Sequence, residues 1–456
     1  MRVLFVVIIL AFSVISASSQ EPIFKAGDRV CFVGNSITNN GEFYHNILTY
    51  YVTRFPNQPV TFFNCGISGD NCSGVLKRMN DDILIHHPTY AVIKLGMNDV
   101  SRGLYTIYPT TNKDTLAKRE EAINAYKVKL DSIVNIFLSR NIKVILQKPT
   151  IYDQTSAIKK ENNFGVNEAL KRCADYIQTL ADKYKLPIVD YWTILNNINT
   201  ELQKKNDTAT IIGPDRIHPG PVGHLIMAYQ FLKTTKVPQY VSEIVIDKDV
   251  ETSNQQSKNC TIIKYINEKN GVSLKIKENA LPFPTIERQK QTLELVPFIN
   301  DLSVEKLVVK NAASKNELRI DNTLIGVFSS DELAKGINLA LYTNTPQYLQ
   351  AKKVRETLDK MWKAVIDLRT IEFVQFKVVN DYKGNKDNLE EVMGYLDMLY
   401  KTKFASNAYY KTQLDKYKIV KANETQLLHD FDYYREHAYK EAQPIEHTFT
   451  ISPLTK

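Results

Sequence analysis

The sequence is short of long apolar runs. The longest, Val3 to Val14, is not exceeded later in the chain. A membrane-spanning helix needs about twenty consecutive apolar residues, so this run is too short for an anchor. It follows one positive charge at Arg2 and precedes Ala17-Ser18-Ser19, an order typical of a secretory signal peptide. We therefore expect residues 1–19 to be a signal peptide, and the protein to be exported, to the periplasm or the extracellular space, with no stable membrane anchor.

Cysteine is also scarce. Five cysteines in 456 residues are odd in number and unpatterned, which does not predict a disulfide framework even though export permits one. We expect buried free thiols, with a Cys65–Cys72 bridge as the alternative. No CxxC or His-rich spacing predicts a metal site. The cysteines are Cys31, Cys65, Cys72, Cys173 and Cys260.

Charge of one sign is not concentrated anywhere. The chain has 58 basic and 50 acidic residues and a formal net charge of +8, with no block of like charge. Nucleic-acid binding needs a basic stripe, so we expect no nucleic-acid partner. The apolar and charged fractions, 43% and 24%, are those of ordinary globular proteins, which argues against disorder or a fibrous class.

Short apolar runs alternate with longer helical patterns through the first half of the chain. Between the runs, apolar residues recur three and four positions apart, which is the helical period. Such alternation predicts a parallel sheet covered on both faces by helices. We therefore expect a three-layer α/β/α domain over residues 21–238. Its expected strands are 29–33, 60–64, 90–95, 142–147 and 187–190, and its expected helices include 41–53, 115–140 and 161–184.

The pattern changes after Val237-Pro238, where short alternating stretches begin. A tight hairpin is predicted at Asp321-Asn322, because Asp and Asn tolerate the positive φ that such turns require. We expect residues 239–456 to form a smaller β-rich and helical C-terminal region. Its expected strands are 260–265, 272–276, 304–309 and 447–451, and its expected helices are 345–370 and 388–439.

The stretch Gly34-Asn35-Ser36-Ile37 carries the first candidate for chemistry. Ser36 follows an apolar strand and precedes a helical pattern. The carboxyl ends of parallel strands form the ligand crevice of such sheets. Helix N-termini also leave backbone N–H groups unpaired, which favours nearby negative charge. Ser36 is therefore a candidate nucleophile beside an oxyanion site, and on this stretch alone a helix N-cap serine is the alternative.

Two further stretches follow the next two strands. Gly69 would let a backbone N–H approach a ligand without interference from a Cβ atom. Asn98 can donate its amide N–H to a developing oxyanion. Seen singly, each residue is also what an ordinary turn contains.

The fourth stretch is Asp215-Arg216-Ile217-His218-Pro219, which follows the fifth strand. A carboxylate three residues before a histidine can accept the imidazole N–H and fix its tautomer. The other ring nitrogen is then free to take a proton from a serine, which is the logic of a catalytic triad. Metal ligation is the rival interpretation, but the expected further His or Cys ligands are missing.

The four stretches occur in order at successive strand ends, and together they resemble the conserved blocks of the SGNH hydrolases, or GDSL esterase and lipase family. The resemblance covers about residues 28–235. It implies a flavodoxin-like fold and ester hydrolysis through an acyl-enzyme, with no cofactor. It further implies that Ser36 is the nucleophile, His218 the general base and acid, and Asp215 its orienting partner. Ser36, Gly69 and Asn98 would then form the oxyanion hole.

Two positions need comment. The family's usual acidic residue before the serine is Asn35 here, and since that position is thought to support the turn, we expect activity to be retained. His224 also matches a recurrent family pattern, and we interpret it as structural.

The C-terminal region is similar to the extension found on secreted bacterial esterases of this family that accompany polysaccharide-degrading systems, chiefly through Asp321 to Ala340. We therefore expect an exported esterase that removes acetyl or similar groups from an acylated glycan or other small ester. The alternatives are a lipase or lysophospholipase of the same family, and a non-catalytic glycan-binding protein with a degenerate hydrolase domain.

Overall fold

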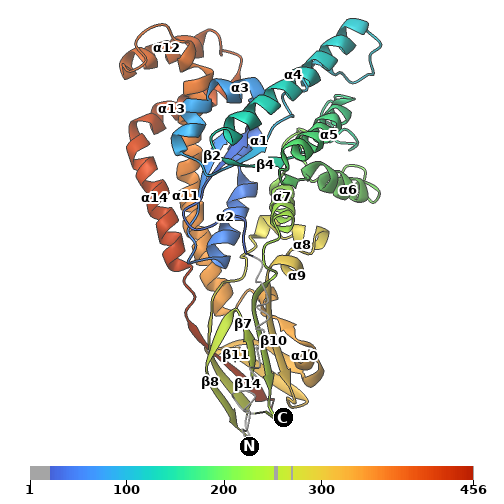
Figure 1. Ribbon diagram of the computed structural model, residues 1–456, viewed down its shortest axis with the longest axis vertical. Helices are drawn as coiled ribbons and strands as arrows, with labels where there is room; N and C mark the ends of the chain where they lie inside the picture. Colours follow the sequence, from blue (N-terminus) through green and yellow to red (C-terminus); the bar gives the residue numbers. More distant parts are fainter. Residues whose placement is uncertain (1–20, 251–254, 269–270, 455–456) are drawn as a thin grey trace, which may run out of the picture.

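The computed structural model describes residues 21–250, 255–268 and 271–454. The expected signal peptide therefore lies outside the described residues. Figure 1 shows an elongated molecule with an α/β part at one end and a β-rich part at the other. The helices α11 (Pro346–Lys377) and α14 (Glu424–Glu441) run side by side along the α/β part.

A five-stranded parallel sheet organises the first half of the chain, as predicted. Its strand order is β2-β1-β3-β4-β5, the order of flavodoxin-like folds. From β1 the chain adds β2 on one side of the sheet and then β3, β4 and β5 on the other side, so the order of strands switches between β1 and β3. In such folds the ligand crevice opens beyond the carboxyl ends of the two strands at the switch. The strands are β1 (Arg29–Gly34), β2 (Thr61–Gly66), β3 (Tyr90–Lys94), β4 (Lys143–Gln147) and β5 (Ile188–Val189).

Helices cover both faces of this sheet. Phe32 packs with residues of α2 and α7, whereas its neighbour Val33 packs with residues of α4 and α5, because successive side chains of a strand point to opposite faces. The helices of this part are α1 (Ser36–Asn40), α2 (Glu42–Arg54), α3 (Cys72–Lys77), α4 (Lys113–Leu138), α5 (Val166–Tyr184), α6 (Tyr191–Gln203) and α7 (Pro221–Thr234).

Two further sheets, one of four strands and one of five, form the β-rich part. The predicted hairpin joins β11 to β12, and both of its turn residues have positive φ, 47° at Asp321 and 68° at Asn322. The expected strand 447–451 is confirmed as the last strand, β14, which lies in the middle of the second sheet. The first sheet contains β6 (Tyr240–Asp247), β7 (Gln256–Lys258), β10 (Val304–Lys310) and β13 (Ile337–Asn338). The second contains β8 (Cys260–Glu268), β9 (Gly271–Glu278), β11 (Lys315–Ile320), β12 (Thr323–Ser329) and β14 (Glu446–Pro453).

Three helix predictions need correction. The helix expected over 345–370 continues to Lys377. The helix expected over 161–184 begins only at Val166, because Gly165 precedes it in the left-handed region. The helix expected over 388–439 is three helices, α12 (Leu389–Lys401), α13 (Ala408–Val420) and α14 (Glu424–Glu441). The remaining helices are α8 (Thr292–Leu295), α9 (Phe298–Leu302), α10 (Ser330–Lys335) and α11 (Pro346–Lys377).

The hydrophobic core on one face of the parallel sheet also contains residues of the C-terminal helices. Leu358 and Met361 of α11 and Phe431 of α14 lie in the same core as Phe43 and Ile47 of α2. The C-terminal helices are therefore packed directly on the α/β part. The five cysteines are buried and free, so the alternative Cys65–Cys72 bridge is not formed.

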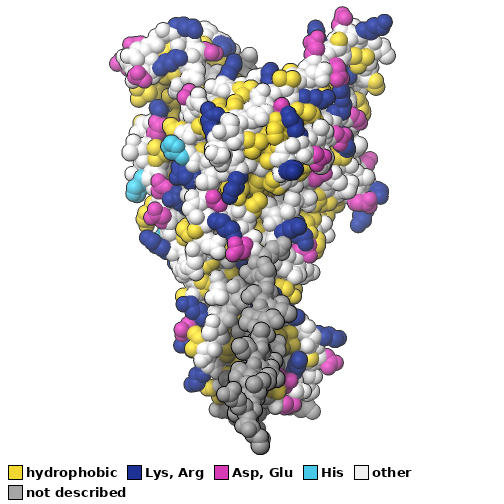
Figure 2. Space-filling view, viewed as in Figure 1, with side chains coloured by type: hydrophobic (Ala, Val, Ile, Leu, Met, Phe, Trp, Pro, Cys, Tyr) yellow, Lys and Arg dark blue, Asp and Glu magenta, His cyan; other side chains and the backbone are white. Residues whose placement is uncertain are grey.

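The surface agrees with the dispersed charge of the sequence. Figure 2 shows basic and acidic side chains interspersed over the face that it presents, without a basic stripe. Among the described residues, no helix combines the length and apolar character needed to span a membrane.

Candidate active site

Ser36 is the first residue of α1, directly after β1. The N-cap of this helix is Asn35, whose side-chain Oδ1 accepts the N–H of Ile37 at 3.2 Å. The alternative role of Ser36 as N-cap is therefore wrong, and its hydroxyl is available for other partners. Asn and Asp cap helices about equally well, which explains how Asn35 can stand where the family usually has an acid.

The structure brings Ser36, His218 and Asp215 together. Oγ of Ser36 lies 2.7 Å from Nε2 of His218, and Nδ1 of His218 lies 2.5 Å from Oδ2 of Asp215. The hydroxyl, the imidazole and the carboxylate thus form one line of hydrogen bonds, with each ring nitrogen of His218 facing a different partner. This is the arrangement in which a carboxylate fixes the imidazole tautomer and the imidazole activates a serine.

The turn from Asp215 to His218 is held by the carboxylate itself. Oδ1 of Asp215 accepts the backbone N–H groups of Ile217 and His218, each at 3.0 Å. Burial would raise the pKa of Asp215, but the hydrogen bonds from the His218 ring and from these two N–H groups outweigh it and hold the pKa well below its ordinary value. Asp215 is therefore ionised throughout the neutral range.

Asn98 follows β3 and is held by two hydrogen bonds. Nη1 of Arg102 donates to its Oδ1 at 2.9 Å, and its Nδ2 donates to the backbone carbonyl of Asp70 at 2.7 Å. A guanidinium can only donate hydrogen bonds, so the Asn98 side-chain atom that faces Arg102 must be the amide oxygen. The amide nitrogen, Nδ2, therefore points away from Arg102. That nitrogen carries a second hydrogen available to a ligand.

Gly69 ends the turn after β2 with a φ of 76°, a conformation that favours glycine. No described atom lies within 4 Å of the position that a Cβ atom would take, so this side of the turn is open. Among the described residues, neither the N–H of Gly69 nor that of Ser36 has a recorded hydrogen-bond acceptor. Both groups are free to donate to a bound oxyanion.

His224 lies on α7, next to the candidate site but not in it. Its ring is buried and stacks on Phe43 with the ring centroids 6.2 Å apart. Burial, with a smaller contribution from the charge of Lys94, lowers the pKa of His224 to about 3 and keeps its imidazole neutral. This matches the structural role expected from the sequence. Within the described part of the chain, no cluster of three or more His, Cys, Asp or Glu residues could hold a metal ion.

Sequence reasoning missed the residues that hold the oxyanion donors. Asp70 is adjacent to Gly69, and Arg102 follows Asn98 by four residues, so both could have been suspected from their proximity in the sequence. Asp99 was also missed. Its carboxylate accepts the N–H groups of Cys72 and Gly96, and thereby ties the loops after β2 and β3 together.

Comparisons with known proteins identify similar chains. Residues 32–226 match the GDSL-like lipase/acylhydrolase family. An acetylxylan esterase from Geobacillus stearothermophilus is 22% identical over 223 residues, which cover 46% of this chain and 94% of that protein. The solved structure of BT4096, a gut microbial diltiazem-metabolizing enzyme, is 28% identical with a TM-score of 0.86, covering 96% of this chain and 100% of that chain. Residues 32–226, in the N-terminal α/β part, therefore form a GDSL-like lipase/acylhydrolase domain, that of the SGNH hydrolases, and the chain is a carboxylic ester hydrolase.

Proposed function

We propose that the protein is an exported serine esterase that removes acyl groups, acetyl above all, from carbohydrate. The observation that carries the proposal is the hydrogen-bonded line from Ser36 through His218 to Asp215. The acetylxylan esterase relative supports the substrate class, and the N-terminal sequence pattern supports export.

In the first half of the reaction, Oγ of Ser36 attacks the ester carbonyl and its proton passes to Nε2 of His218. The negative charge that develops on the carbonyl oxygen is stabilised by the N–H groups of Ser36 and Gly69 and by Nδ2 of Asn98. Asp215, being ionised, stabilises the imidazolium. When the tetrahedral intermediate collapses, the sugar hydroxyl leaves with the proton from His218, and the acyl group stays on Ser36.

In the second half, a water molecule attacks the acyl-enzyme. His218 accepts the proton of this water, and the same three donors hold the second oxyanion. Collapse of this intermediate breaks the bond to Oγ of Ser36, which recovers its proton from His218. The carboxylic acid is released, and the enzyme returns to its starting state without a cofactor.

A lipase or lysophospholipase is the second candidate. A cavity of about 450 Å³ with mostly apolar walls adjoins Gly213 and Pro214, in the loop that carries Asp215. An apolar cavity beside a catalytic loop is where a long acyl chain would bind. By contrast, the cavity of about 440 Å³ beside Gly69 is lined by polar and charged residues, among them Asp70, Lys77 and Lys377, which suits a carbohydrate better.

Substrate screening separates these candidates. We expect acetate release from acetylated xylooligosaccharides and from nitrophenyl acetate, with turnover falling as the nitrophenyl ester lengthens to decanoate. Diltiazem, the compound metabolised by the structural relative, serves as a further test substrate with acetate as the readout. A preference for decanoate would favour the lipase, whereas well-folded protein inactive on every ester would favour the glycan-binding alternative. Fractionation of cells expressing the chain with and without residues 1–19 tests export.

A further inference from the structure

The loop that carries Gly69 is held by the C-terminal region. We call residues 66–71 the oxyanion loop and residues 346–420, which contain α11 to α13, the helical lobe. Ile67 of the oxyanion loop is fully buried, and its side chain belongs to the core of the helical lobe. Its neighbours in that core include Ile371 and Val374 of α11, Leu396 of α12 and Leu414 of α13. One side of the loop is therefore packed on a part of the chain that follows the family domain.

Arg369 of α11 fixes the start of the oxyanion loop. Its Nε donates to the backbone carbonyl of Gly66 at 3.1 Å, and its two terminal nitrogens bind the carboxylate oxygens of Asp82 at 2.6 and 3.0 Å. Burial would raise the pKa of Asp82, but Arg369 and Arg78 outweigh it and lower the pKa to about 2. The guanidinium of Arg369 is thus locked by a buried charged partner while it holds the loop.

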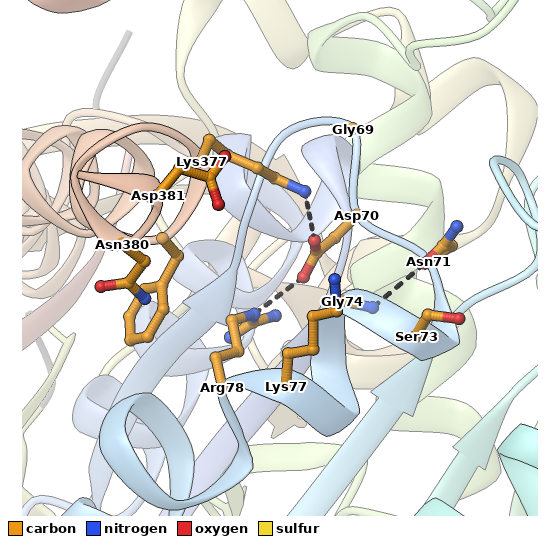
Figure 3. A pocket seen from close by; sticks show the side chains of 11 residues that line it. Gly69, Asp70, Asn71, Ser73, Gly74, Lys77, Arg78, Lys377, Asn380 and Asp381 are labelled. Atoms are coloured by element: carbon orange, nitrogen blue, oxygen red, sulfur yellow. Dashed lines mark hydrogen bonds and ion pairs between the residues drawn. The ribbon is translucent and has the colours of Figure 1, made fainter. Parts of the chain in front are cut away.

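Lys377, at the end of α11, fixes the other end of the oxyanion loop. Its Nζ binds Oδ1 of Asp70 at 2.6 Å, while Nε of Arg78 binds Oδ2 at 2.7 Å. Figure 3 shows the carboxylate of Asp70 between these two cations, directly after the turn at Gly69. Arg78 belongs to the α/β part, whereas Lys377 is 307 positions from Asp70 in the sequence.

The ion pair is connected to two of the three proposed oxyanion donors. Asp70 follows Gly69 directly, so the orientation of the Gly69 N–H depends on the placement of Asp70. The backbone carbonyl of Asp70 also accepts the hydrogen bond from Nδ2 of Asn98. A displacement of Asp70 would therefore move both donors together, and misplacement of a catalytic group by 1 Å can cost about a hundredfold in rate.

We propose that Lys377 is a positioning residue, which sets the geometry of the oxyanion hole through Asp70, and that the helical lobe thereby completes the active site. This inference rests on the proposed function, because it assigns Gly69 and Asn98 to the oxyanion hole. It gives the C-terminal region a role in the chemical step that is separate from any role in binding a glycan.

We expect the fold to tolerate replacement of Lys377. A cavity of about 440 Å³ lies between the oxyanion loop and the end of α11, with Lys377, Asn380 and Asp381 on one side and Gly69 and Lys77 on the other (Figure 3). The Lys377 side chain is 24% exposed, so its loss opens no packed core.

The first experiment compares Lys377→Met and Lys377→Arg by steady-state kinetics on nitrophenyl acetate. We expect Lys377→Met to lower kcat by about tenfold to a hundredfold, with KM nearly unchanged, because the oxyanion donors act on the transition state. We expect Lys377→Arg to recover most of the lost kcat. The affinity for a boronic acid, which mimics the tetrahedral intermediate, should fall in the same proportion as kcat.

Asp367→Asn is the matched control. Asp367 lies on the same helix and pairs with Lys416 of α13 at 2.7 Å, with no contact to the oxyanion loop among the described residues. We expect its kcat to match that of the wild type. Equal losses in Lys377→Met and Asp367→Asn would mean general loosening of the helical lobe and would overturn the proposal, as would an unchanged kcat in Lys377→Met.

A chemical rescue keeps the test decisive if Lys377→Met folds poorly. The native cysteines are buried, so the thiol of Lys377→Cys can be modified selectively. Alkylation with bromoethylamine restores an ammonium at this position, whereas alkylation with iodoacetamide adds a neutral group. We expect kcat to recover only with the ammonium, and equal recovery with both reagents would overturn the proposal. Failure of the proposed function is distinguishable, because it would appear as a wild-type protein without esterase activity.

Discussion

Oγ of Ser36 and Nε2 of His218 lie 2.7 Å apart, although 182 positions separate the two residues in the sequence. The fold explains the contact. Ser36 follows β1, which is one of the two strands at the switch in strand order. The loop that contains His218 leads into α7, and α7 packs beside α2. Both residues therefore reach the crevice at the carboxyl edge of the sheet.

The first prediction concerns the triad as a unit. Ser36→Ala and His218→Ala should each lower ester turnover by about a thousandfold or more, and the double variant should be little worse, because the serine is activated only through the imidazole. The measurement is kcat/KM on nitrophenyl acetate for the three variants. Losses that multiply in the double variant would contradict the proposed linkage.

Residues of the same types that lie outside the proposed site provide the controls. Ser139 follows the end of α4 and His437 lies on α14, both away from the crevice. Ser139→Ala and His437→Ala should keep the turnover of the wild type.

The second prediction concerns Asn98. Asn98→Ala should lower kcat by roughly a hundredfold to a thousandfold with little change in KM, because one donor to the oxyanion is lost. Arg102→Met should lower kcat less, since Arg102 only orients the amide of Asn98. An unaltered kcat in Asn98→Ala would remove Asn98 from the oxyanion hole.

The third prediction concerns the pH dependence of stability. Lys94, at the end of β3, is 2% exposed, and its ammonium lies over the ring of Phe43, 5.9 Å from the ring centroid. Its burial lowers the pKa to about 7, from 10.5 in an unfolded chain. Between these two values the unfolded state binds more protons than the folded state, so the free energy of unfolding rises with pH, by up to about 1.4 kcal/mol per pH unit.

Lys94→Met removes the pH-dependent contribution of Lys94 to the free energy of unfolding. We expect the variant to be more stable than the wild type at pH 7, and the difference to shrink as the pH approaches 10. Urea unfolding of both proteins at several pH values in this range measures the difference in their free energies of unfolding. Two stability curves that run parallel would show that Lys94 is not the group responsible.

The fourth prediction concerns the buried cation beneath the oxyanion loop. Arg78 binds the carboxylates of Asp70 and Asp82, and its Nη2 donates to the carbonyl of Cys65 at 2.9 Å. Arg78→Met should lower the free energy of unfolding by about 3–5 kcal/mol, because each of two buried carboxylates loses one of its two cationic partners. Arg172→Met, which breaks an ion pair with Glu120 that is about half exposed, should cost less than about 1 kcal/mol. Similar losses in the two variants would contradict this account.

The features that depend on a local pattern of residues could be predicted from the sequence. The strand that ends before Ser36 is a continuous apolar run, as strands buried on both faces are, and the hairpin at Asp321-Asn322 is specified by residues that tolerate positive φ. The polar residues after β1, β2 and β3 had to lie at one edge, because parallel strands share their carboxyl ends.

Other features were present in the sequence but were missed. Asn407 caps α13 by accepting the N–H of Tyr410, and this signal would have divided the helix expected over 388–439. The contacts of Lys377 with Asp70 and of Arg369 with Asp82, by contrast, could not be predicted from the sequence. They depend on how α11 packs on the α/β part, and no local spacing encodes that packing.

The most direct test of the account is covalent labelling with a fluorophosphonate, followed by mass-spectrometric mapping of the modified residue. The reagent reacts with a serine whose hydroxyl is activated by a neighbouring base. We predict one modified peptide with the label on Ser36, and loss of labelling in the folded His218→Ala variant. Labelling of another serine, or labelling of Ser36 that is unaffected by His218→Ala, would contradict the proposed mechanism.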